Sequence, residues 1–406
     1  MPALRFMKRR IFISILVLIV LSQLPFAYRR YRLARLRTAI ANLSTQRLQP
    51  ETSGDDYVDY KGVIHVHTSL GGHSNGTFAE LIAAAKANQL DFVIMTEHPQ
   101  AEFDTSAMTL SGVHSDVLFV NGNEVATANG DRLLLVPGTA NAASLNSHTT
   151  QQIIDQQNAA AGLAFVAYPS ESQNWQSTTP SGVEVYNLFT NTKHANRVGL
   201  FFDGLWSYRS YADLMFANFF ARPGEDLKRW DDAMTSTKRK LVAIAGNDAH
   251  SNIGISLNDE SGNQLMGIKL DPYERSFRTV RTHVLIKKEK GLTRESLLEA
   301  LSQGHCYVSF DLFSDASGFR FTAAETDKIM GDDESANNQL KLSVRTPLPA
   351  RVVLMKNGIP FEEKTGTSTE FISSGPGTYR IEAYLNGLSS PAQGKPWVIS
   401  NPIYIK

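Results

Sequence analysis

The stretch that decides the fold is Gly62-Val63-Ile64-His65-Val66-His67, in which two histidines close a short apolar run. A second apolar run, Phe92 to Met95, leads into Thr96-Glu97-His98. Between the two runs, Thr77 and Glu80 have the spacing of a capping box, which begins a helix. A strand-helix-strand unit of this kind joins parallel strands by a right-handed crossover, and the carboxyl ends of parallel strands carry functional residues. The pattern predicts an α/β fold with metal-ligand residue types at one edge of its sheet.

Two later runs end in the same way. Leu118 to Val120 leads to Glu124, and Leu241 to Ala245 leads to Asp248 and His250. In a strand, residues two apart face the same side, so each His-x-His or Asp-x-His pair can ligate together. Imidazole with carboxylate, and no thiolate, favours Zn²⁺, Mn²⁺ or Fe²⁺. The candidate metal ligands are His65, His67, His73, His98, Glu124, Asp248 and His250.

Composition narrows the class of protein. The chain has 406 residues, is 42% hydrophobic, and its 40 basic and 40 acidic residues cancel. It can therefore bury a large core, and it lacks the basic balance typical of nucleic-acid binders. The single cysteine, Cys306, excludes an intrachain disulfide and a thiolate metal cluster. We expect a small-molecule substrate, and the composition leaves the oligomeric state open.

The N-terminal segment predicts a membrane anchor. Residues 1–37 hold an apolar span at about 11–27, with basic residues on both sides. Seventeen apolar residues are at the short end for a membrane-spanning helix, but Pro25 disfavours cleavage after Ala27 as in a signal peptide. Basic residues before and after the span are nearly balanced, so they do not fix its orientation. We expect a single-pass anchor, a polar linker over 38–56, and a soluble enzyme on the periplasmic or extracytoplasmic side.

The rest of the chain divides into two parts. From 57 to 312, strand-like and helix-like segments alternate. From 320 to 406, short alternating strands are separated by turn residues and no helix is evident, which predicts a small antiparallel β-sandwich.

The motifs of residues 57–312 resemble those of a known superfamily. In order they are Ile64 to Ser69, Thr96 to His98, Gly122 to Glu124, and Asn247 to His250, and together they are similar to the PHP (polymerase and histidinol phosphatase) superfamily. The resemblance implies a distorted (β/α)7 barrel that binds up to three divalent metals and cleaves phosphoesters. The ending Trp397 to Tyr404 resembles the carbaryl-hydrolase-like (CehA/McbA) branch, which adds a small C-terminal β domain.

Four positions depart from the family pattern. Leu133 to Leu135 stands where many members have a histidine, and Ala167-Tyr168-Pro169 lacks another. Both would serve one metal, so we expect two metal ions, or a third bound weakly, with Tyr168 free to offer its hydroxyl to substrate. Asn75 replaces an acidic residue of some branches, which makes His73 the ligand from that loop. Glu97 replaces the more usual aspartate.

The resemblance and the ligand grouping suggest how the residues divide. One metal would take His65, His67, Glu124 and Asp248, and the second would take His73, His98 and His250, with Glu124 or a hydroxide completing it. Two metals make a hydroxide nucleophile available at neutral pH, so Glu124, Asp248 and His250 are the expected catalytic residues. Expected substrate contacts are Tyr168, Glu184, Lys193 and Arg197. The basic side chains of Lys193 and Arg197 are the expected binding groups for a phosphate.

Three functions remain open at this point. The first is a membrane-anchored, divalent-metal-dependent phosphoesterase, and the second is the same site acting on an amide or carbamate ester. A phosphate requires Arg or Lys over the metals, whereas a neutral ester favours aromatic walls, and the aromatic run from Phe201 to Trp230 leans toward the second. The third is a non-catalytic binding protein stabilised by metal.

Overall fold

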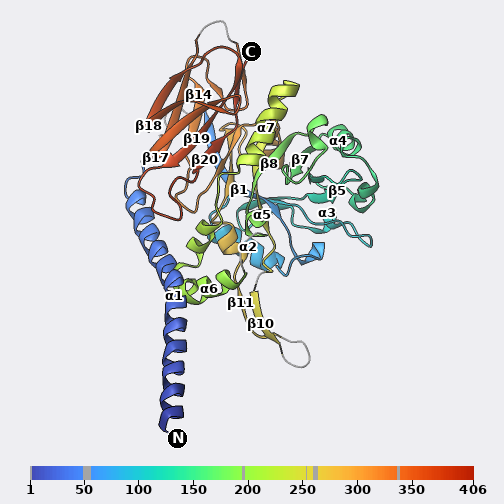
Figure 1. Cartoon of the computed structure of the whole chain (residues 1–406). Coiled ribbons are helices and arrows are strands. Elements are labelled where there is room, and N and C mark those ends of the chain that lie inside the picture. Colours follow the sequence, from blue (N-terminus) through green and yellow to red (C-terminus); the bar gives the residue numbers. More distant parts are fainter. Residues whose placement is uncertain (1, 49–55, 194–196, 253, 259–263, 336–338) are drawn as a thin grey trace.

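The computed structural model describes residues 2–48, 56–193, 197–252, 254–258, 264–335 and 339–406. The fold is mixed α/β, built around one large, strongly curved sheet. Its N- and C-termini lie at opposite ends of the molecule (Figure 1).

The sheet of the α/β part runs in the order β4-β2-β1-β9-β8-β7-β6-β5. Neighbours are parallel from β4 through β7, whereas β5–β6 and β6–β7 are antiparallel. A parallel bridge between Glu97 and Asn123 brings β5 back to the end of β2. The finer prediction of a seven-stranded (β/α) barrel stays a prediction, since two of these pairs break the parallel pattern. The strands are Tyr57–Val66 (β1), Phe92–Met95 (β2), Gly112–His114 (β3), Val117–Val120 (β4), Asn123–Ala126 (β5), Arg132–Val136 (β6), Leu163–Ala167 (β7), Gly182–Asn187 (β8) and Val242–Ala249 (β9).

Apolar side chains fill the inside of this curved sheet. Ile64, Ile94 and Phe165, from three different strands, pack together there with almost no exposure. Helices cover the outside, and the capping box of Thr77 and Glu80 is formed at the start of α2 as predicted. The helices are Phe78–Ala87 (α2), Thr105–Met108 (α3), Thr150–Ala159 (α4), Leu188–Lys193 (α5), Arg197–Tyr211 (α6), Gly224–Thr237 (α7), Tyr273–Ser276 (α8) and Arg294–Gln303 (α9).

The C-terminal strands continue the same sheet. The first half of β1 pairs with β12, β12 with β13, and β13 with β20, which is among the last strands of the chain. No helix occurs among the described residues beyond Gln303. The strands are Arg281–Lys287 (β12), Cys306–Ser309 (β13), Arg320–Ala323 (β14), Lys328–Ile329 (β15), Asp333–Glu334 (β16), Lys341–Lys356 (β17), Ile359–Ile372 (β18), Gly377–Leu385 (β19), Val398–Ser400 (β20) and Ile403–Ile405 (β21).

The N-terminal helix α1, Pro2–Ser44, is longer than the sequence predicted. It runs into the segment expected to be a linker, because Leu36 and Leu43 are buried against the folded part and hold this stretch helical. Its N-terminal portion stands free of the body, and a window of 18 residues within Phe6–Ser44 has a mean hydropathy of 2.3. The helix is long and apolar enough to cross a membrane, and a signal sequence would also fit.

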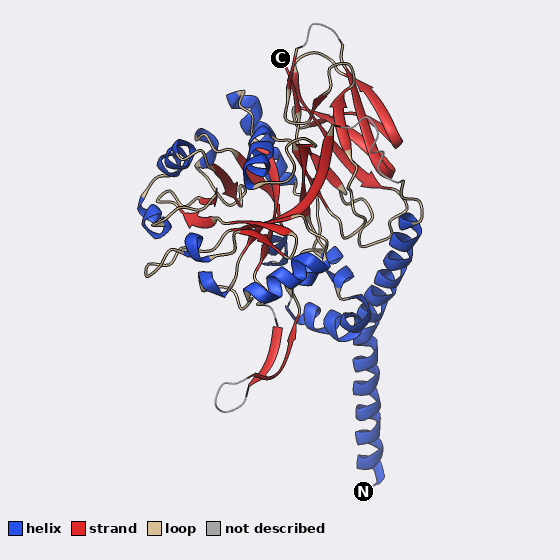
Figure 2. Ribbon diagram, turned by 180° about the vertical axis from the view of Figure 1, so that it is seen from behind, coloured by secondary structure: helices blue, strands red, loops and turns tan. Residues whose placement is uncertain are grey.

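A two-stranded hairpin leaves the body close to the predicted site. It consists of β10, Gly254–Asn258, and β11, Gln264–Lys269. It projects from the body in the same direction as the N-terminal part of α1 (Figures 1 and 2).

Candidate metal centre

Six of the predicted ligands meet at the carboxyl end of the central strands. His65 and His67 come from the end of β1, and His98 follows β2. Two groups have ligand atoms that all lie within 4.8 Å of one another, namely His65 with His67 and Glu124, and His67 with His98 and His250. His67 belongs to both, so it lies at the centre of the cluster and not in one of two separate sets as the sequence suggested.

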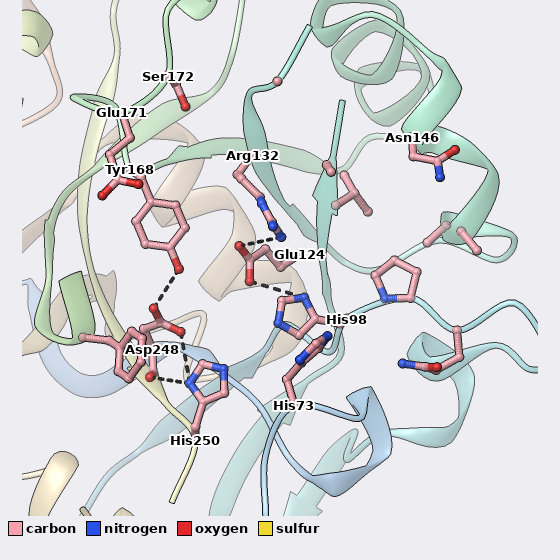
Figure 3. Close-up of a pocket in the computed structure, with 18 of the residues that line it drawn as sticks. His73, His98, Glu124, Arg132, Asn146, Tyr168, Glu171, Ser172, Asp248 and His250 are labelled. Atoms are coloured by element: carbon pink, nitrogen blue, oxygen red, sulfur yellow. Dashed lines mark hydrogen bonds and ion pairs between the residues drawn. The ribbon is translucent and has the colours of Figure 1, made fainter. Parts of the chain in front are cut away.

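Two carboxylates face the two histidines of β1. The Glu124 Oε2 atom lies 3.2 Å from His65 Nε2 and 3.4 Å from His67 Nε2. The Asp248 Oδ1 atom lies 3.5 Å and 3.4 Å from the same two nitrogens. The ring of His67 also stacks on those of His98 and His250, at 4.5 and 4.4 Å between centroids. In Figure 3 the side chains of His98, Glu124, Asp248 and His250 point toward one another.

Three buried polar atoms at the centre of the cluster have no hydrogen-bond partner among the described residues. They are both ring nitrogens of His67 and the Oδ1 atom of Asp248. Leaving a buried polar group unsatisfied costs about 1–3 kcal/mol, so an arrangement of this kind requires an explanation. A neutral imidazole has one free lone pair, so a cation can accept it from one ring nitrogen of His67, together with a lone pair of Asp248 Oδ1. The donor set therefore fits divalent ions, and its nitrogen and oxygen ligands suit several metals equally.

Glu124 and His98 have the protonation states that metal binding requires, whereas at His65 burial is outweighed by the charges of Glu184, Asp248 and Glu124, which raise its pKa well above the ordinary value unless a cation neutralises them. Burial raises the pKa of Glu124, but the charges of His65 and His67 outweigh it and lower this pKa to about 2. Burial and the charge of His67 lower the pKa of His98 to about 3. Glu124 is therefore a carboxylate and His98 a neutral imidazole near neutral pH, as ligation requires.

The backbone at His65 differs from the regular strand assumed above. His65 has φ of 68°, and the pairing of β1 with both β2 and β9 shifts register between Ile64 and Val66. Asp248 also has positive φ, at 49°. A residue other than glycine rarely adopts this conformation, and the strain is typical of functional sites. A bulge, and not simple alternation, brings the two histidines to one cluster.

Glu184 supports His65 and does not face the cavity. It is 1% exposed, and its Oε1 atom lies 2.6 Å from Nδ1 of His65. Asn187 donates to both oxygens of Glu184 at 3.2 Å. A Cβ atom at Gly246 of β9 would lie 1.3 Å from Glu184 Oε1, so glycine is required for this side chain to lie under the ring. The predicted substrate role of Glu184 is wrong for this reason, and the carboxylate instead orients the imidazole.

We expect Glu184→Gln to weaken metal binding by roughly 10- to 100-fold, because the amide cannot accept the His65 proton as a carboxylate does. Calorimetric titration of the purified chain with Mn²⁺ or Zn²⁺ measures this affinity. Glu299→Gln, which changes an exposed ion pair with Lys290, is the matched control. Equal affinities in the two variants would show that Glu184 has no part in the centre.

Glu97 and His73, two further residues of the predicted motifs, lie at the edge of the cluster. Glu97 is fully buried and accepts hydrogen bonds from the backbone and hydroxyl of Thr68, at 2.9 and 2.6 Å, so it fixes the chain just after β1. His73 lines the cavity with its ring 4.9 Å from that of His98, but it belongs to neither close ligand group. Its role as a ligand stays a prediction.

The cluster forms the floor of a cavity of about 840 Å³. Tyr168, with φ of 50°, donates from its hydroxyl to Asp248 Oδ2 at 2.7 Å. Arg132, which sequence reasoning missed, lies with Nη1 3.5 Å from Glu124 Oε1, and its side chain is 46% exposed (Figure 3). The sequence could have indicated this residue, because Arg132 is the first residue of the strand that follows Glu124. Other polar lining residues that the sequence did not indicate are Gln100, Asn146, Glu171, Ser172 and Asn252.

Two of the predicted substrate contacts are not placed: the side chains of Lys193 and Arg197 lie outside the described residues. Three residues of the aromatic run do not wall the site, since Phe220 and Trp230 are buried in the core and Phe202 packs on Phe26 of α1. Packing in the core explains Phe220 and Trp230, and contact with α1 explains Phe202, so these residues do not form an aromatic pocket.

A third group of possible metal ligands consists of His283, Asp311 and Asp315, and basic side chains of the protein neutralise its carboxylates. His283 Nδ1 lies 2.9 Å from Asp59 Oδ1, and Nε2 lies 3.2 Å from Asp311 Oδ2. Burial lowers the pKa of His283, but Asp311 and Asp59 outweigh it and raise the pKa to about 10. Arg281 pairs with Asp311, and Lys61 with the neighbouring Asp315. A protonated histidine held in such a network is structural.

Comparison with known proteins gives little further information. No family model matches the chain, and no curated protein matches it. Among solved structures it is similar to PsfC from Pseudomonas syringae PB-5123, at 12% identity and a TM-score of 0.36, over 60% of this chain and 89% of that one. It is also similar to Endonuclease Q, solved in complex with a 27-mer duplex substrate with an abasic lesion at the active site, at 14% identity and a TM-score of 0.35, over 60% and 56% of the two chains. These similarities are too low to assign a family, so the chemistry of the site rests on its own residues: buried His, Asp and Glu groups that can hold metal ions.

Proposed function

We propose that this chain is a membrane-anchored, divalent-metal-dependent hydrolase of phosphate esters, with a PHP-like barrel. The observation that carries the proposal is His67. It is fully buried, has no hydrogen-bond partner among the described residues, and lies between two carboxylates under an open cavity. A purely structural histidine would have its ring nitrogens satisfied.

The chain's own residues divide the work as follows. His65, His67, Glu124 and Asp248 would hold one cation, and His73, His98 and His250 would hold a second. Divalent ions bound there supply Lewis acidity and lower the pKa of a water nucleophile toward ~7. Tyr168 holds the Asp248 carboxylate through its hydroxyl, and Glu184 holds the tautomer of His65.

Arg132 favours phosphate over a neutral ester. Its guanidinium reaches the wall of the cavity beside Glu124, where it can bind phosphoryl oxygens in a bidentate manner. A carbamate or amide has no charge for this group to match. Arg132 therefore supplies the cation that the sequence placed at Lys193 or Arg197.

We expect Arg132→Ala to lower kcat/KM for a phosphate monoester by about 10- to 100-fold, the equivalent of about 1.5–3 kcal/mol for a charged hydrogen bond. Hydrolysis of a neutral carboxylic ester should change little. Arg132→Lys should recover part of the loss, since it keeps the charge without the bidentate geometry. Arg239→Ala, an exposed site away from the cavity, is the control. Equal losses on both substrates would contradict a phosphate-binding role.

The proposal as a whole is tested on the purified full chain in detergent. Bound metal is counted, and hydrolysis of p-nitrophenyl phosphate and p-nitrophenyl acetate is measured with added Mn²⁺. About two metal ions per chain with phosphatase activity supports the proposal. Ester cleavage alone would assign the site to amide or carbamate-type esters, and metal without any hydrolysis would assign it to binding.

A further inference from the structure

Helix α6 packs beside α1 at the point where α1 leaves the folded part (Figure 1). The rings of Phe26 and Phe202 lie 5.0 Å apart, and Arg29 Nη1 lies 2.5 Å from Asp203 Oδ2. The indole nitrogen of Trp206 donates to Gln23 Oε1 at 3.1 Å. These contacts fix α6 at the level of Gln23 to Arg29 on α1.

The same helix exposes large apolar side chains. Phe201 is 56% exposed and Leu205 is 72% exposed, and Trp206 beside them is 37% exposed. Phe201 and Leu205 are four residues apart, so they share one face of the helix. Exposed apolar side chains gathered on one helix face mark a site of interaction.

The level along α1 at which the apolar face of α6 lies indicates what this face contacts. The apolar stretch of α1 runs from about Ile11 to Ala27, or ~25 Å of helix, which is slightly short of a hydrocarbon core of about 30 Å. Gln23 and Phe26 therefore lie at the boundary between acyl chains and headgroups, and α6 lies at the same level. Tryptophan is enriched at this boundary, and Arg29 and Arg30, beside α6, suit acidic headgroups.

We propose that the middle of α6 is a second membrane contact, in which Phe201 and Leu205 enter the lipid interface beside the anchor. The inference rests on the proposed anchoring by α1. It implies that the bilayer covers the α6 face, and that the folded part is held against the membrane at two points.

Site-specific fluorescence on the full chain tests this contact. Cys306 is fully buried, so a thiol-reactive fluorophore labels only an added cysteine, and the unaltered chain serves as the blank. Leu205→Cys and Phe201→Cys report on α6, and Ile15→Cys reports on the anchor. Ile359→Cys, 69% exposed on β18, is the matched apolar control away from α1. Each labelled chain is placed in phosphatidylcholine vesicles with a minor share of phosphatidylglycerol.

Brominated lipids quench a fluorophore that touches them, and aqueous iodide quenches one in water. We expect about a twofold loss of fluorescence at positions 205 and 201 with bromine near the headgroup, and at position 15 with bromine deeper in the chains. Position 359 should respond to iodide alone. Quenching at 15, with 205 and 201 behaving like 359, would overturn the α6 contact and leave the anchor intact. Protection of 205 from both quenchers would indicate a second copy of the chain and overturn it too. No lipid quenching at any position would overturn the anchor and the contact together.

Discussion

Replacing His67 by alanine is expected to remove about one metal ion per chain and to slow phosphate-ester hydrolysis roughly a thousandfold, or ~4 kcal/mol of activation free energy. His67 belongs to both close ligand groups and faces both carboxylates. Its loss therefore removes a ligand from one metal position, together with the ring that stacks on His98 and His250 beside it.

Metal analysis and steady-state kinetics measure this effect, with His114→Ala as the control, because His114 lies outside the cluster and its ring contacts Ser111 and Phe119. Thermal unfolding in a chelator separates the ligand role from a structural one. Since His67 has no hydrogen-bond partner among the described residues, alanine should not lower the stability of the metal-free chain by more than the lost packing. Full metal content in the variant would refute the proposed centre.

The largest expected effect on stability is at Arg380, where alanine should lower the free energy of unfolding by about 3–5 kcal/mol. Arg380 is 1% exposed on β19. It donates to Asp231 of α7 at 2.8 and 3.1 Å and to Glu382 at 2.7 Å. Arg222 pairs with Glu382 as well, at 2.6 and 2.7 Å. Removing Arg380 leaves the buried Asp231 carboxylate without its cation, and this uncompensated charge is the source of the cost.

Denaturant unfolding followed by circular dichroism measures the change. Lys228→Ala is the matched control, because Lys228 pairs with Asp232 on the same helix α7 but both side chains are more than half exposed. Exposed pairs of this kind contribute little to stability, so Lys228→Ala should change the free energy of unfolding far less than Arg380→Ala does. Similar losses in the two variants would show that burial of the Arg380 network has no special importance.

The sequence predicted the types of residue at the site better than their geometry. Ligand residues at the ends of apolar runs indicated the cluster, because parallel strands bring their carboxyl ends to one edge. The pattern did not indicate the bulge at His65, since a backbone with positive φ at a histidine depends on tertiary contacts around it. Nor did it separate Glu184, buried under His65, from a carboxylate that faces the substrate.

Contacts that form only in the folded chain explain the other differences between the sequence predictions and the structure. Arg132 and Glu124 become neighbours only through the antiparallel pairing of β5 with β6. The helical extension of α1 to Ser44 depends on Leu36 and Leu43 finding apolar partners far along the chain, which local propensity does not report. The aromatic residues near α6 and α7 were visible in the sequence, but their assignment to packing required the core itself.

The continuity of α1 has a consequence for how an anchored enzyme would meet its substrate. The helix passes without a break from the apolar stretch to residues buried in the body, and Arg32 is bonded to Ser390 near the C-terminal strands. If α1 crosses a bilayer, the cavity would lie at a fixed distance and a fixed tilt from it, whereas an enzyme on a flexible linker would sample a wide volume. Changing the helical phase between Tyr28 and Leu33 by a single inserted residue would rotate the mouth of the cavity about the membrane normal by about 100°. In an anchored enzyme, this one helix would thus set the distance and orientation of the cavity relative to the membrane. Substrates that diffuse along the membrane plane would be the first to be affected by a change in it.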